Sequence, residues 1–199
     1  VMECKKALIE SDGDINKAAR RVHGHGLSAI SKKTSSVAKD GIITISYSHL
    51  LKKITMAEVN SETDFVARSE GFRNFVYDLS HAALKNCTLI VEDILNIALS
   101  NDKTINETLN ALMLKVGEKI LLRRIVSLKG SGISCYNHNN RIGVILKIKG
   151  GNKCLAKDIS MHIAASNPLV VSQNQIPPSL LEKERKNYFK QVSSMGKSE

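Results

Sequence analysis

The chain has no tryptophan, and aromatic residues make up only 4% of its 199 residues. Proteins bind single-stranded nucleic acids largely by stacking bases on aromatic side chains, so this composition argues against a stacking platform. No apolar run approaches the ~18 residues that a membrane-spanning helix needs. The first residues, VMECKKALIE, do not have the pattern of a signal peptide. These absences favour a soluble, cytoplasmic protein without membrane association.

Motifs for nucleotide binding, metal binding and catalysis are also missing. The sequence contains neither a GxxxxGK[ST] phosphate loop nor a GxGxxG fingerprint, so we expect no bound nucleotide or other cofactor. The cysteines are far apart and never form CxxC, which favours reduced, structural thiols; they are Cys4, Cys87, Cys135 and Cys154. Only His23 and His25 lie close together among the histidines, with no further ligands nearby. We therefore predict no metal site and no enzyme activity of its own.

The charge is one-sided. A total of 29 Lys and Arg residues against 19 Asp and Glu residues gives a net charge of +10. This excess is typical of nucleic-acid-binding proteins, but the basic residues are scattered in doublets such as Lys5-Lys6 and Arg123-Arg124. A basic RNA- or ribosome-binding accessory protein is therefore the alternative hypothesis. The salt dependence of binding tests this hypothesis, because the affinity of a protein for nucleic-acid phosphates falls steeply as the salt concentration rises.

The N-terminal part has helical periodicity. The expected order is a helix over residues 3–11, a break at Asp12-Gly13, and a second helix that Asp14 caps and Gly24-His25-Gly26 ends. Two such short helices cannot enclose a core unaided. A third is expected, either from residues 27–36 or from sequence upstream of Val1.

From Gly41 the hydrophobic period changes to that of strands, and helices and strands then come in two clusters, which predicts an α+β protein. The first expected elements are a hairpin over 41–59, a helix capped by Ser69 and a helix near 90–99. A further helix is expected to begin at the Thr104–Glu107 capping box and to end at Gly117, and three strands are expected over 119–149. Two helices follow: one with Leu155, Ile159 and Ile163 facing inward and Asn167-Pro168 at its end, and a last one that begins at a Ser179–Glu182 capping box.

The segment VNSETDFVARSEGF, residues 59–72, holds the candidate site. Asp64 is expected at a helix N-terminus, where a carboxylate is favoured by the helix dipole. Phe65 follows it. Considered alone, a phenylalanine directly after a strand is more often a core residue than a contact residue, so both interpretations of Phe65 stay open at this point.

Five segments, in order along nearly the whole chain, resemble the bacterial elongation factor Ts family. EVNSETDFVARSEGF is similar to the family signature, and VMECKKALIESDGDINKAA is similar to its N-terminal signature. The other three segments are VGEKILLRRI, SCYNHNNRIGVIL and DISMHIAASNP. The pair Asn139-Asn140 departs from the small residues that usually follow the histidine of the fourth segment, and Val1 departs from the usual Met.

The resemblance implies a small ubiquitin-associated-like helical head, two α+β subdomains with antiparallel strands, and a helix that leads out. The expected boundaries are 1–36 for the head, 37–131 and 132–178 for the two subdomains, and 179–199 for the start of a C-terminal extension. The family's first helix would precede Val1, and the family continues beyond a chain of this length, so we expect a protein truncated at both ends.

The resemblance also implies the function of a guanine-nucleotide exchange factor, which binds the GTPase elongation factor Tu and promotes GDP release. Asp64 and Phe65 match the residues that intrude into the partner, Val1 and Met2 match an apolar contact pair, and His138 matches a more distant contact. The expected partner-binding residues are Val1, Met2, Thr63, Asp64, Phe65, Val66 and His138.

Overall fold

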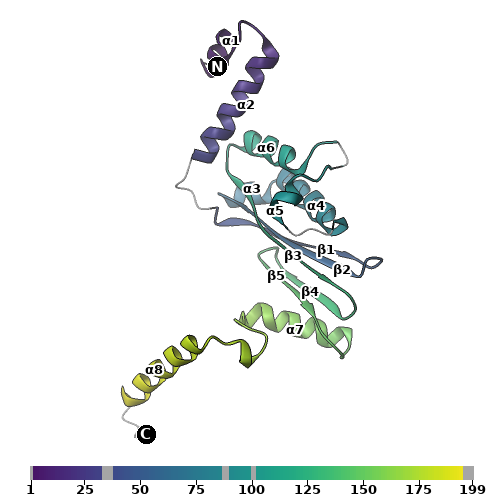
Figure 1. Cartoon of the computed structure of the whole chain (residues 1–199), viewed down its shortest axis with the longest axis vertical. Helices are drawn as coiled ribbons and strands as arrows, with labels where there is room; N and C mark the ends of the chain where they lie inside the picture. The colour runs from purple at the N-terminus through teal and green to yellow at the C-terminus, as the bar shows by residue number, and fades with distance from the viewer. Residues whose placement is uncertain (1, 33–37, 87–89, 100–101, 195–199) are drawn as a thin grey trace. The chain divides into compact units, whose positions relative to one another are not determined.

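The computed structural model describes residues 2–32, 38–86, 90–99 and 102–194. The chain forms two compact units, Val1–Ala164 and Ala165–Glu199. Within the described ranges, helices combine with strands that pair antiparallel (Figure 1). The predicted α+β class is confirmed. The predicted division into four parts and the ubiquitin-associated-like character of the head stay predictions.

A three-stranded antiparallel sheet organises the larger unit. Its strands are β1 (Asp40–Ser48), β2 (Lys53–Ser61) and β3 (Ile120–Lys129), in the order β1-β2-β3. Asp40 lies opposite Ser61 at one end of the β1–β2 hairpin, and Ser48 lies opposite Lys53 at the turn. The hairpin predicted over 41–59 is therefore confirmed. The end that carries Asp40 and Ser61 also positions the candidate site.

A β-bulge interrupts the pairing of β2 with β3. Glu58 pairs with Arg124 and Val59 pairs with Leu122, so Arg123 is the extra residue. The carboxylate of Glu58 then accepts hydrogen bonds from both arginines. Because β3 is an edge strand, this pair of cations also discourages the addition of another strand there.

Four helices pack on one face of the sheet (Figure 1): α3 (Asp64–Arg68), α4 (Glu70–Lys85), α5 (Val91–Leu95) and α6 (Ile105–Val116). Phe72 and Leu79 of α4 are fully buried there, each contributing about 1.5–3 kcal/mol of burial free energy. The core also contains Ala57 and Val59 of β2, Ile120, Leu122 and Ile125 of β3, Ile94 of α5, and Ile105 and Leu109 of α6.

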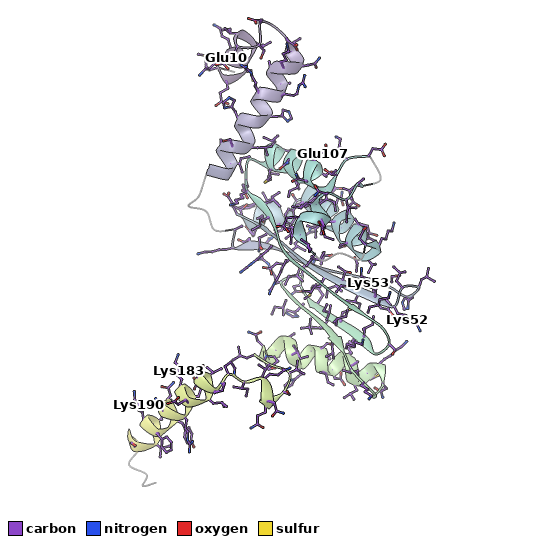
Figure 2. The ribbon with its side chains drawn as sticks, in the orientation of Figure 1. Glu10, Lys52, Lys53, Glu107, Lys183 and Lys190 are labelled. Carbon is purple, nitrogen blue, oxygen red and sulfur yellow. The ribbon has the colours of Figure 1, made fainter. Side chains whose placement is uncertain are left out.

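The predicted caps of α4 and α6 are present. Ser69 accepts a hydrogen bond from the backbone N–H of Phe72 at the start of α4. Thr104 forms a complete capping box with Glu107, whose position on α6 is labelled in Figure 2. Gly117 ends α6 in the left-handed conformation with φ 74°. The helix expected near 90–99 is shorter than predicted, because Ala98 bridges to Thr104 instead of continuing α5.

A second hairpin covers the opposite face of the sheet. It consists of β4 (Ile133–His138) and β5 (Ile142–Lys147), which confirms the three strands predicted over 119–149. Gly143 makes the close approach possible. A Cβ at this position would lie 2.5 Å from Ile43 Cγ2 and 2.7 Å from Met56 Sδ. A side chain here would push the hairpin away from β1 and β2.

Helix α7 (Lys153–Ser166) follows the hairpin and ends before Asn167, as predicted. Its predicted inner face is partly wrong. Ala156 and Ser160 are the buried residues, whereas Leu155 is 48% exposed. Ala156 and Ser160 are four residues apart, so they lie on one face of the helix, and Leu155 lies outside that face.

The N-terminal helices are α1 (Met2–Ile9) and α2 (Ile15–Lys32). The predicted end of the second helix at Gly24-His25-Gly26 is wrong, because α2 continues through both glycines. Residues 27–32 form the end of α2 and not a third helix, and residues 33–37 lie outside the described residues. Each helical glycine costs about 1 kcal/mol, which packing of α2 on α6 offsets. Ile30 is buried, and a Cβ at Gly26 would lie 2.7 Å from Leu114 Cδ2.

The smaller unit contains a 3-10 turn (Gln173–Gln175) and α8 (Pro178–Ser194), which carries Lys183 and Lys190 (Figure 2). The predicted Ser179–Glu182 capping box is wrong. The helix begins at Pro178, whose fixed φ suits the first helical position, so Ser179 lies inside the first turn. Glu182 instead forms an ion pair of 2.8 Å with Lys186.

Candidate functional site

The candidate site begins where β2 ends at Ser61 and α3 begins at Asp64. Thr63 is the N-cap of α3, and its hydroxyl oxygen accepts a hydrogen bond from the backbone N–H of Val66. Ser69 ends α3 and begins α4, since its hydroxyl donates to the Val66 carbonyl and accepts from the Phe72 backbone N–H. The short helix is therefore capped at both ends.

Phe65 is not a core residue. Its side chain is 82% exposed, whereas Phe72, one helix further along, is 0% exposed. Val66 and Ala67, the next residues of α3, are buried in the main core. Phe65 therefore projects from the outer side of a helix whose inner side is anchored. Of the two open interpretations of this residue, the core interpretation is excluded.

Asp64 and Val66 are placed differently from each other. Asp64 is partly exposed at the first position of α3 and forms an ion pair of 2.9 Å with Arg68, one turn later. Its charge suits the helix N-terminus. Val66 is buried, so its side chain supports the site from below. We expect direct contact with a partner from Asp64 and Phe65 and only support from Val66.

A carboxylate that the sequence analysis did not single out holds Thr63 in place. The Thr63 hydroxyl lies 2.9 Å from Glu118 Oε1, and the Thr63 backbone N–H donates to Glu118 Oε2 at 3.2 Å. In return, the Lys119 backbone N–H donates to Glu62 Oε1 at 3.0 Å. The turn after α6 and the segment before α3 thus hold each other through two glutamates.

A signal for Glu118 was present in the sequence. It directly follows Gly117, which ends α6, and a carboxylate next to a helix C-terminus is disfavoured by the helix dipole. An acidic residue in such a position suggests a hydrogen-bond partner elsewhere in the fold. Its partner, Thr63, is distant in the sequence, and only the tertiary structure reveals it.

His138 is the last residue of β4 and is exposed. Its ring Nδ1 lies 3.1 Å from the Tyr136 hydroxyl oxygen. The following pair, Asn139-Asn140, has φ angles of 51° and 57°. Asparagine adopts this left-handed conformation more readily than most residues, so the unusual pair fits the turn. Partial desolvation raises the pKa of the nearby Cys135 thiol above its ordinary value, although the residue as a whole is exposed.

The tip of this hairpin is attached to the beginning of β1. The Ile43 backbone N–H donates to the Asn140 carbonyl at 2.8 Å, and Asn137 Nδ2 donates to the Ile43 carbonyl at 3.2 Å. Arg141 forms an ion pair of 2.7 Å with Asp40. Since Asp40 lies opposite Ser61, just before the Thr63–Val66 segment, the fold brings His138 and Phe65 to the same end of the sheet.

Of the two N-terminal site residues, Met2 is not part of this arrangement. Val1 lies outside the described residues. Met2 is 77% exposed at the start of α1, and α1 packs on α2, which in turn packs on α6. Met2 therefore belongs to a different layer from the Thr63–Val66 segment.

Predictions from the sequence also concern the metal ligands and thiols of the described residues. Outside the gaps in the description, no three His, Cys, Asp or Glu side chains are grouped so that they could hold a metal ion. Cys4, Cys135 and Cys154 are free and exposed, so the expectation of structural thiols is wrong for these three. Cys87 lies outside the described residues. No helix in the described part is long and apolar enough to cross a membrane.

Comparison with known proteins identifies the family. A sequence model described as Elongation factor TS matches residues 62–199. The elongation factor Ts of Legionella pneumophila (strain Paris) is 44% identical over 99% of this chain and 68% of its own length. That of Alcanivorax borkumensis is 41% identical over 99% of this chain and 70% of its own length. The chain belongs to the elongation factor Ts family.

More distant members align over the same span. The elongation factor Ts of Arthrospira platensis is 38% identical over 99% of this chain and 80% of its own length. The family assignment therefore covers the whole candidate site, including the Thr63–Val66 segment, Glu118 and the His138 hairpin. It identifies this chain as a translation elongation factor of the Ts type.

Proposed function

We propose that this elongation factor Ts binds the GTPase elongation factor Tu and promotes GDP release by inserting Phe65 into it. The observation that carries the proposal is the 82% exposure of Phe65 on a helix anchored from within. An uncovered aromatic ring offers a large contact area with few torsions to immobilise. Asp64 fixes the approach, and His138, at the same end of the sheet, adds a second contact.

The proposed mechanism is negative coupling between two ligands of the GTPase. The factor and the nucleotide each weaken the binding of the other, so no covalent step and no catalytic residue is required. Lowering nucleotide affinity a thousandfold needs ~4 kcal/mol of differential binding. A phenylalanine side chain covers ~150–250 Å², and burying its exposed part provides a gross gain on the order of 4 kcal/mol.

That gain is not all available, because association costs rigid-body and side-chain freedom. Further contacts are therefore needed, and we assign them to His138 and to the N-terminal pair Val1 and Met2. The proposed roles follow the predicted parts: residues 1–36 and 37–131 meet the nucleotide domain of the GTPase, and 132–178 meets a second domain. This function places the protein in the cytoplasm.

The test is GDP release from the Tu-type GTPase of the same organism, preloaded with a fluorescent GDP analogue and chased with excess GTP. The wild-type chain is expected to accelerate release, and Phe65→Ala is expected to accelerate it far less. Equal acceleration by both proteins would refute the role of Phe65. No acceleration by either would refute the exchange function.

The alternative, RNA or ribosome binding, is supported by the net charge of +10. The same chain titrated with RNA at rising salt distinguishes the two. RNA binding that is tight and falls steeply with salt would favour the alternative. Acceleration of GDP release that persists as salt rises supports the exchange function, because a wedge-like protein contact is less sensitive to salt.

A further inference from the structure

Every polar group of Thr63 is occupied, and two of its partners, Glu118 and Ser61, lie outside α3. The backbone N–H and hydroxyl donate to Glu118, and the carbonyl accepts from the Ser61 hydroxyl at 2.9 Å. Because a threonine hydroxyl has one proton, donation to Glu118 leaves its lone pairs to accept the Val66 N–H. Glu118 therefore selects the hydroxyl orientation in which Thr63 can cap α3.

This arrangement matters because the described residues leave Phe65 82% exposed. An exposed ring is held only by the backbone that carries it, and α3 has five residues, too few to be stable alone. Its inner residues anchor one side of the helix, but the direction in which it leaves β2 depends on Thr63. We propose that Glu118 is a positioning residue that fixes the first turn of α3 and so aims Phe65 at the partner.

The inference rests on the proposed function, because it assigns Glu118 a role through Phe65. We call the hydrogen bonds from Thr63 to Glu118 the brace. Without the brace, residues 63–65 would have to become ordered when the partner binds, and immobilising the backbone lowers the binding affinity. We expect Glu118→Ala to slow GDP release about tenfold, which corresponds to about 1.4 kcal/mol. Glu118→Gln keeps a carbonyl acceptor for the Thr63 hydroxyl, and we expect it to restore part of the rate.

A double-mutant cycle separates positioning from general destabilisation. If Glu118 acts through Phe65, Glu118→Ala should change the rate of GDP release less than about twofold in a Phe65→Ala background. The matched control is Glu107→Ala, which removes a carboxylate from the other end of α6 without touching Thr63. This control should lower the melting temperature and leave exchange at the wild-type rate.

A second measurement needs no partner. Amide hydrogen exchange at Thr63 and Val66 should be faster in Glu118→Ala than in wild type, because the brace orders both N–H groups. Hydrogen exchange at the backbone amide of Phe72, in the first turn of α4, should change little. If GDP release fails even for wild type, the proposed function is refuted, and the hydrogen-exchange result still decides whether the brace exists.

Any one of the following results would overturn the inference. The first is wild-type GDP release by folded Glu118→Ala. The second is the same tenfold loss in both the wild-type and Phe65→Ala backgrounds, which would place the action of Glu118 elsewhere. The third is a loss equally large in Glu107→Ala, or unchanged amide exchange at Thr63 and Val66, either of which would reduce Glu118 to a general contribution to α6.

Discussion

Replacing Phe65 with alanine removes a ring that the fold leaves uncovered, so its effects on stability and on function should separate. The side chain is 82% exposed, and less than a fifth of its surface is covered by the rest of the chain. With ~150–250 Å² for a phenylalanine and ~25 cal/mol per Å², the free energy of unfolding should fall by about 1 kcal/mol or less.

Phe72→Ala is the matched control, since it removes the same side chain from a position that is 0% exposed. The lost burial and the cavity left between α4 and the sheet should lower the free energy of unfolding by about 3–5 kcal/mol. The two variants have the same chemistry and lie close together in the sequence. Any difference between them therefore reports their places in the fold.

The two variants should have the opposite order of effects on GDP release. A central aromatic contact typically costs about 2 kcal/mol or more when truncated, so Phe65→Ala should slow GDP release about 30-fold or more at equal concentration of folded protein. Phe72→Ala should exchange normally in whatever fraction remains folded. Urea unfolding and the GDP-release assay measure the two effects. A large loss of stability for Phe65→Ala, with exchange intact in the folded fraction, would refute the reasoning.

Three further predictions concern groups around this site. His138→Ala should leave the melting temperature unchanged and weaken binding to the GTPase by about 1 kcal/mol, which titration calorimetry can measure; unchanged affinity would remove His138 from the interface. Glu58→Gln should lower stability by about 1 kcal/mol at low salt and less in 1 M salt, because the two arginines bound to Glu58 are largely exposed; a salt-independent loss in urea unfolding would contradict this. Hydrogen bonds from the backbone and hydroxyl of Thr104 lower the pKa of Glu107 below its ordinary value of 4.5. The difference in stability between wild type and Glu107→Gln should therefore be fully present above pH 4.5 and should disappear as the pH falls through the lowered pKa. A difference that persists in acid would rule out the ionised carboxylate as its source.

Local signals predicted most of the element boundaries. The Ser69 cap, the Thr104–Glu107 capping box and Gly117 each depend on groups within a few residues, and the structure confirms all three. The β1–β2 hairpin follows from alternating apolar residues in the same local way. Such features are readable from sequence because their partners are near in the chain.

Predictions failed where distant packing outweighed local preference. Gly24 and Gly26 favour a helix end, yet α2 passes through both because its second half packs on α6. On α7, Leu155 is more apolar than Ala156, yet the smaller residue is the buried one. For α2 the deciding contact comes from α6, which is far away in the sequence and which periodicity does not report.

The candidate site divides in the same way. The sequence alone determined that Asp64 begins a helix, and its resemblance to the family motifs predicted that Thr63–Val66 and His138 belong to one functional set. It left open whether Phe65 is core or surface, because a phenylalanine has the same apolarity in either place. The tertiary structure decided this by burying Val66 and Ala67 against the sheet and leaving Phe65 outside. It also brought Glu118 to Thr63 and the His138 hairpin to β1, since hydrogen bonds between distant segments form only once the sheet has set their register.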